Sequence, residues 1–164
     1  MLSRKLQDAI NDQIKNELYS AYLYLAMAAH CEASSLPGFA KWLKVQSHEE
    51  WMHGMKFYDF LNDRGGRVTL QAVSQPPATY KSVLGIFEHV LEHEQKVTGC
   101  INKLYELAQQ ERDYPAQVLL QWFITEQVEE EKNATQIVEQ LKMVPEKGGV
   151  LLFIDRDMGK RGEK

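Results

Sequence analysis

The chain has 164 residues, of which 44% are apolar and 26% are charged, values that fit one globular domain spanning residues 1–164. Its net charge of −4 argues against nucleic acid as the main partner and makes a cationic ligand electrostatically easier to bind. No segment reaches the apolar length of a membrane span, and the first residues lack the apolar block of a signal peptide, so we expect a cytoplasmic protein with no membrane partner. Cys31 and Cys100 form no CxxC motif and are expected to be reduced thiols.

Helical periodicity divides most of the chain into four long amphipathic segments followed by a short one. Leu36-Pro37-Gly38 ends the first pattern, Gly65-Gly66 ends the second, and Asp113 followed by Pro115 is typical of a helix start. The last six residues, GKRGEK, are expected to form a solvated tail. These signals predict an all-α fold with a four-helix bundle over residues 4–143, its helices at 4–33, 39–62, 82–110 and 113–143, and a short fifth helix at about 148–158.

The connections between these helices predict the topology. The first two helices meet across a few residues, as do the third and fourth, so each pair must be antiparallel. Residues 65–81 join the two pairs, and 17 extended residues reach about 55 Å, whereas a 25-residue helix is about 38 Å long. This segment can therefore run the whole length of the bundle and make the second and third helices parallel, which is the arrangement of ferritin-like folds.

The inner stripe of each long helix contains a glutamate where a leucine would be expected. The apolar positions follow the i, i+3, i+4, i+7 spacing of one helix face, and these stripes contain no lysine or arginine. An unpaired carboxylate in a core costs several kcal/mol, and four together would repel one another. Two divalent cations would balance the charge of these four carboxylates. The four inward residues are Glu17, Glu50, Glu94 and Glu130.

Spacing supports the same site independently. Glu17 and Glu50 are 33 residues apart, and the same separation joins Glu94 to Gln127 in the second pair of helices. A further polar residue follows three positions after Glu50 and after Gln127, on the same helix face, so that each pair can hold a single metal ion. Oxygen donors with one imidazole suit Fe(II) or Mn(II) and tolerate Zn(II), and redox chemistry selects iron. The predicted dinuclear site consists of Glu17, Glu50, His53, Glu94, Gln127 and Glu130.

These residues, together with Tyr24 and the runs HEEWMH and TEQVEEE, resemble those of bacterial non-haem ferritins, and the resemblance covers essentially the whole chain. It implies that Glu17, Glu50 and His53 form a first iron position. Glu94 and Glu130 would form a second position, with Glu50 as the bridge between the two, and Gln127 would support the site or hold a water. The resemblance also implies a third, weaker iron position toward the interior, formed by Glu49, Glu126, Glu129 and the shared Glu130.

Aromatic residues refine this resemblance. Tyr24 lies two helical turns after Glu17 on the same face, where the family's tyrosine hydrogen-bonds near the site and can donate an electron. In bacterioferritins a haem-ligating methionine directly follows the glutamate of Glu-x-x-His, but here Trp51 holds that place and Met52 comes one residue late, so no haem is expected. Trp122 is interpreted as a core residue.

The i, i+4 pair His89 and His93 has a spacing that can bind zinc, but it lies beside Glu88 and Glu92, off the inner stripe. A solvated outer face is therefore the expectation for both histidines.

The resemblance implies a ferroxidase that oxidises Fe(II) with O₂ or H₂O₂ and stores ferric oxyhydroxide inside a hollow shell of 24 identical subunits. Two alternatives remain open. A bundle of this kind can keep a permanent di-iron cofactor and reduce peroxide, or the buried glutamates can be structural elements of a non-enzymatic interaction protein.

Overall fold

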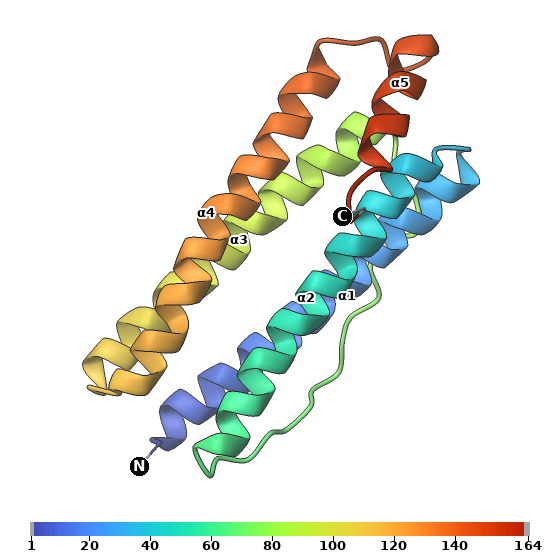
Figure 1. The fold of residues 1–164 in the computed structure, drawn as a ribbon. Coiled ribbons are helices and arrows are strands. Elements are labelled where there is room, and N and C mark those ends of the chain that lie inside the picture. Colours follow the sequence, from blue (N-terminus) through green and yellow to red (C-terminus); the bar gives the residue numbers. More distant parts are fainter. Residues whose placement is uncertain (1, 163–164) are drawn as a thin grey trace.

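The computed structural model describes residues 2–162, which form five α-helices (Figure 1). Side chains cap three of them: Ser3 accepts a hydrogen bond from Leu6 N at 3.1 Å, Ser82 accepts one from Gly85 N at 3.1 Å, and Asp113, as predicted, accepts one from Ala116 N at 3.0 Å. The helices are α1 (Arg4–Ala33), α2 (Pro37–Asp63), α3 (Val83–Gln110), α4 (Tyr114–Lys142) and α5 (Gly149–Met158).

The start of α2 differs from the prediction by two residues, because the helix begins at Pro37 and not at Phe39. Proline is favoured in a first turn, where its missing N–H would have no partner. The preceding Leu36 supplies no side-chain cap, and Asp155 of α5 takes that role, since its Oδ1 accepts a hydrogen bond from Phe39 N at 2.9 Å. The cap of α2 therefore comes from a part of the chain more than a hundred residues away.

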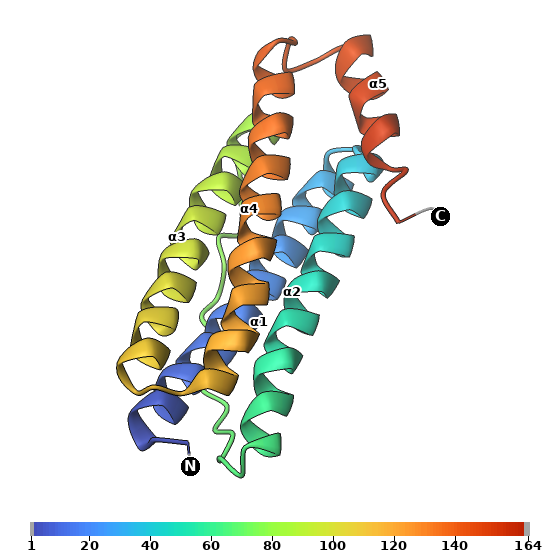
Figure 2. The same ribbon diagram turned by 60° about the vertical axis from the view of Figure 1, so that its left-hand side comes forward.

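The topology is the one predicted, with α1 packed along α2 and α3 along α4 (Figures 1 and 2). The crossover between α2 and α3 runs along the full length of the bundle, so these two helices point in the same direction. Asn11 fixes the crossover to α1: its amide donates to Arg67 O at 3.0 Å, and its Oδ1 accepts from Thr69 N at 2.7 Å. The predicted all-α ferritin-like fold is thus confirmed.

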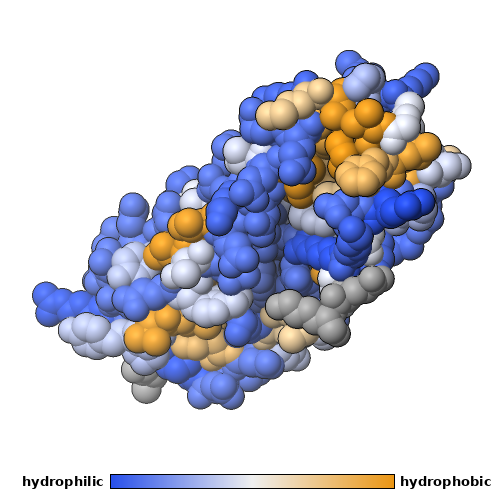
Figure 3. Space-filling view, turned by 45° about the horizontal axis from the view of Figure 1, so that its top comes forward, coloured by the Kyte–Doolittle hydropathy of each residue, from blue (hydrophilic) through white to orange (hydrophobic). Residues whose placement is uncertain are grey.

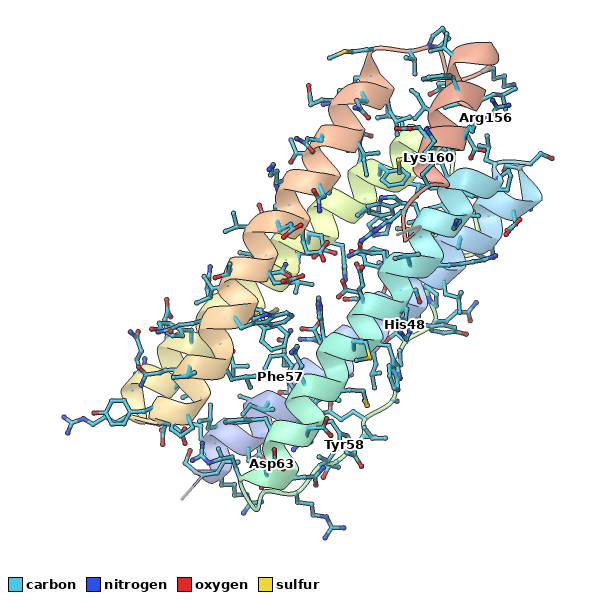
Figure 4. All side chains as sticks on the ribbon, in the orientation of Figure 1. His48, Phe57, Tyr58, Asp63, Arg156 and Lys160 are labelled. Carbon is cyan, nitrogen blue, oxygen red and sulfur yellow. The ribbon has the colours of Figure 1, made fainter. Side chains whose placement is uncertain are left out.

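The core consists of two apolar clusters, one toward each end of the bundle. One includes Leu43 and Phe87, and the other includes Ile14 and Phe57. Phe57 lies on the side of α2 that faces α4, whereas the exposed His48 lies on the side away from it (Figure 4). The acidic residues of the inner stripes fall between these clusters, so a polar layer divides the core at mid-height.

The face of the molecule shown in Figure 3 is mostly hydrophilic, with an apolar patch at the end that carries α5. There Val150, Leu152 and Phe153 are 53%, 57% and 72% exposed. Within residues 2–162, no helix is both long enough and apolar enough to cross a bilayer. Both cysteines are free thiols, as predicted, with Cys31 buried and Cys100 partly buried.

Candidate metal centre

The polar layer contains all four inward glutamates, His53 and Gln127, and none of these six side chains belongs to a residue more than 6% exposed. Each helix of the bundle contributes, because Glu17 lies on α1, Glu50 and His53 on α2, Glu94 on α3, and the rest on α4. Helical periodicity turns these positions inward between apolar neighbours one turn above and one turn below. The structure thus brings together residues that are more than a hundred positions apart in sequence.

Two overlapping groups of ligand atoms are close enough to hold metal ions. Glu17, Glu50 and His53 each offer one ligand atom within 4.8 Å of the others. Glu50, Glu94 and Glu130 form a second group by the same measure. Both groups contain Glu50, whose two oxygens can serve two ions at once. The geometry therefore offers a pair of metal positions that share a carboxylate.

Electrostatics makes this layer unfavourable without cations. Burial, followed by the charge of Glu50, raises the pKa of Glu17 to about 8. Burial, followed by the charge of Glu94, raises the pKa of Glu130 to about 7. The pKa values of Glu50 and Glu94 are raised as well, in both cases mainly by burial. Protons or metal ions must neutralise this site, so metal binding is expected to displace protons from it.

Three glutamines support the carboxylates. Gln13 Nε2 donates to Glu17 Oε1 at 2.8 Å, and Gln46 Nε2 donates to Glu50 Oε1 at 3.0 Å and to Glu130 Oε2 at 2.8 Å. Gln127 Nε2 donates to Glu94 Oε2 at 3.1 Å, next to the centre. These amide N–H groups favour the ionised form of the carboxylates, and each fixes an oxygen of the carboxylate that accepts its hydrogen bond.

Gln13 and Gln46 are functional neighbours that the inner stripes alone do not reveal. Gln46 lies on the inner stripe of α2, but the stripe does not indicate that its amide contacts the site. Gln13 lies outside the apolar pattern of α1. A signal does exist in the sequence: each glutamine stands four residues before a site glutamate, and 33 residues separate the two. The spacing that relates Glu17 to Glu50 therefore also relates the amides that hold them.

Tyr24 lies in the layer and donates a hydrogen bond from its hydroxyl to Glu94 Oε1. Burial and the nearby carboxylates, Glu94 first, raise its pKa well above the ordinary value for tyrosine, so the phenol stays protonated. His93 packs edge-on against this ring, with centroids 5.8 Å apart, and its Nε2 lies 2.7 Å from Ser20 Oγ. The expectation of a solvated outer face is therefore wrong for His93, because the ring turns back toward α1.

Trp122 also differs from its interpretation as a core residue. It is 38% exposed, and its ring packs edge-on against His53 with centroids 5.5 Å apart. Lys56 Nζ lies 4.3 Å from the centre of the same ring. Trp122 thus covers the imidazole of the centre on the side toward solvent.

The residues proposed for a third metal position separate into two groups. Glu126 has a ligand atom within 4.8 Å of atoms on His53 and Glu130. Glu49 instead forms an ion pair with Arg161, and Glu129 is exposed. In the described part of the chain, neither Glu49 nor Glu129 belongs to a group of three convergent ligands.

A crossover bundle whose buried carboxylates form two linked metal positions is the plan of ferritin-like di-metal proteins. A family model described as "Ferritin-like domain" matches residues 7–144. The bacterial non-heme ferritin of Staphylococcus aureus (strain USA300) is 38% identical over 161 residues, covering 98% of this chain and 97% of that protein. The corresponding protein of Staphylococcus haemolyticus (strain JCSC1435) is 37% identical with the same coverage.

Solved structures agree with these sequences. The open pore ferritin of the archaeon Archaeoglobus fulgidus is 49% identical, with a TM-score of 0.96 and 98% of each chain covered. A structure described as humanized archaeal ferritin gives a TM-score of 0.97 at 46% identity, covering 98% of this chain and 99% of that one. The chain belongs to the ferritin family.

Proposed function

We propose that this protein is an iron-storage ferritin that oxidises Fe(II) to Fe(III) at its intrasubunit centre with O₂ or H₂O₂ and deposits ferric oxyhydroxide inside a hollow shell. One observation carries the proposal: two groups of convergent buried ligands share Glu50 in the middle of a ferritin bundle. Four ionised carboxylates carry a charge of −4, which two Fe(II) ions balance.

Within this proposal, Glu17, Glu50 and His53 bind one Fe(II), and Glu50, Glu94 and Glu130 bind the other. The first position includes an imidazole, whereas the second has only oxygen donors. Oxygen donors suit both Fe(II) and Fe(III), so the ligands tolerate the loss of one electron from each iron to the bound oxidant. An oxygen-only position with partly protonated ligands holds iron less firmly, which favours release to the interior over permanent retention.

Tyr24 and Gln127 act on Glu94 from two sides. The phenol donates to Oε1 and the amide donates to Oε2, so the carboxylate of the second position is fixed before iron arrives. Tyr24 is also the buried phenol nearest to this position in the hydrogen-bonded layer, and it can supply an electron to the oxidant as it releases its proton. Trp122 shields His53 from water on the outer side.

Assembly is the second part of the proposal. The exposed apolar side chains of Leu152 and Phe153 on α5 form a patch that suits a contact between subunits. We propose a closed shell of 24 subunits, with a third iron position at Glu49, Glu126, Glu129 and Glu130 toward its cavity, and without haem.

The test compares Fe(II) oxidation by the protein as isolated with that by the variant Glu50→Ala/His53→Ala. The variant removes the shared carboxylate and the imidazole, so the fast phase of oxidation should disappear. Glu88→Ala, an exposed glutamate on α3, is the matched control and should oxidise iron at the original rate. Unchanged fast oxidation in the double variant would show that the site is placed wrongly.

The mass of the assembly distinguishes storage from the alternatives. A shell of 24 chains of 18.9 kDa has a mass of about 450 kDa and should retain hundreds of irons per particle. A small oligomer with about two tightly held irons per chain would instead indicate a peroxide-reducing di-iron protein.

A further inference from the structure

The chain after α5 is not the solvated tail expected from GKRGEK, because residues 159–162 turn back onto α2. Gly159 allows the turn: a side chain there would meet Gly38 Cα at 3.3 Å, so the two backbones touch. Arg161 N then donates to Met158 O at 3.3 Å, and Gly162 adopts a left-handed φ of +81° with Val45 beside it. Lys160 marks this return toward α2 (Figure 4). Residues 163 and 164 lie outside the described residues.

The guanidinium of Arg161 is held on two sides. Its Nη2 donates to Glu49 Oε2 at 2.5 Å, and its Cζ lies 4.1 Å above the ring of Trp42. The side chain is 21% exposed, so both contacts form in a partly desolvated place. Its Nη1 is buried and has no hydrogen-bond partner among the described residues. The guanidinium of Arg161 therefore packs against α2, and its Nη1 still has N–H groups that can donate a hydrogen bond.

This cation lies next to the metal centre. Glu49 directly precedes Glu50 in α2. The negative charge of Glu49 raises the pKa of Glu130, and the positive charge of Arg161 lowers it. Glu130 in turn groups with Glu126 and His53 as possible metal ligands. The guanidinium is thus held at Glu49, one residue from the shared Glu50, and Glu49 is one of the ligands proposed for the third iron position.

We propose that Arg161 is a positioning residue that competes with a metal ion for Glu49 and so keeps the third cation position weak. This inference rests on the proposed function, since it concerns the position to which iron passes from the paired centre. With Glu49 paired to Arg161 and Glu129 exposed, the convergent ligands left for a metal ion are Glu126, Glu130 and His53, and the ion also meets the repulsion of the guanidinium. The arginine therefore favours passage of iron through this position over its retention.

Zn(II) is a suitable probe because it binds the same donors without redox chemistry. Calorimetric titration of the metal-free assembly with Zn(II) should show two strong positions per chain and a weaker third one. In Arg161→Gln, the third position should bind Zn(II) on the order of tenfold more tightly, because one repulsive charge is lost and Glu49 is set free. Zn(II) should still fill both positions of the paired centre, and the position formed by Glu17, Glu50 and His53 should keep its affinity.

Three further variants exclude a merely structural effect of the tail. Arg161→Lys keeps the charge and should restore weak binding at the third position. Arg156→Gln removes a positive charge from the exposed face of α5 and should leave all three positions unchanged. In Arg161→Gln/Glu49→Gln the gain should vanish, because the freed carboxylate is no longer present.

An unchanged third affinity in Arg161→Gln, or an equal gain in Arg161→Lys, would overturn this inference while the two strong positions stand. Loss of the two strong positions from the unaltered protein would instead contradict the proposed function. The two failures are therefore distinguishable in one set of titrations.

Discussion

Glu17 makes the stability of the metal-free protein depend on pH in a direction opposite to that of ordinary carboxylates. Its pKa rises from the ordinary 4.5 in the unfolded chain to about 8 in the folded one, because the carboxyl is buried and faces Glu50. Below pH 4.5 the carboxyl is protonated in both states, so the stability is fully present. As the pH rises from 4.5 to 8 the unfolded chain ionises while the folded one keeps its proton, and this stability is lost. Between pH 5 and pH 9 the loss amounts to about 4 kcal/mol.

The variant Glu17→Gln isolates this effect. A neutral amide can still accept the hydrogen bond from Gln13, and its own N–H groups lie beside the carboxylate of Glu50. The variant should match the original protein near pH 5 and exceed it in stability by up to about 4 kcal/mol at pH 9. Urea denaturation of chelator-treated protein at one fixed subunit concentration, from pH 5 to pH 9, gives the comparison.

Glu88→Gln, on the exposed face of α3, serves as the control and should follow the original protein at every pH. The reasoning is refuted if the original protein and Glu17→Gln lose stability in parallel between pH 5 and pH 9. Excess Zn(II) should abolish the pH dependence of the original protein, since bound metal replaces the proton on Glu17.

Three further changes test other parts of the structure. Gln46→Leu removes the amide that favours ionised Glu50 and Glu130, so calorimetry in buffers of different ionisation enthalpy should record more protons released per Zn(II) bound at pH 7. Asn11→Leu leaves Arg67 O and Thr69 N without that partner, which should cost about 1–3 kcal/mol and speed proteolytic cleavage within the crossover. Gly38→Ala would place a Cβ 1.6 Å from the carbonyl oxygen of Asp155, so amide exchange in α5 should accelerate while that in α3 stays slow.

The helical stripes were sufficient to predict the fold and the layer in which the glutamates meet. A glutamate such as Glu94 is easily recognised because it replaces an apolar residue in a regular pattern, and the repeated spacing of 33 residues pairs the helices. Chain reach then decides the topology, since only a crossover explains residues 65–81. These predictions depend on periodicity and length, both of which are local properties of the sequence.

Contacts that depend on where separate elements meet could not be predicted in this way. His93 lies off the stripe of α3, and only the packing of α1 against α3 turns its ring toward Tyr24. Arg161 follows a short helix and a glycine, so its position depends on the docking of α5 against α2. Because these contacts depend on how separate helices pack, no periodic pattern in the sequence indicates them.

The divided core has a consequence for how the protein opens. Two apolar clusters lie in series along the bundle, and the layer between them contains carboxylates that repel one another when no cation is bound. The metal-free chain should therefore behave as two cooperative folding units that exchange their amide hydrogens at different rates. Bound cations join these units into one, so the same ions that form the cargo also determine how much of the molecule unfolds at a time.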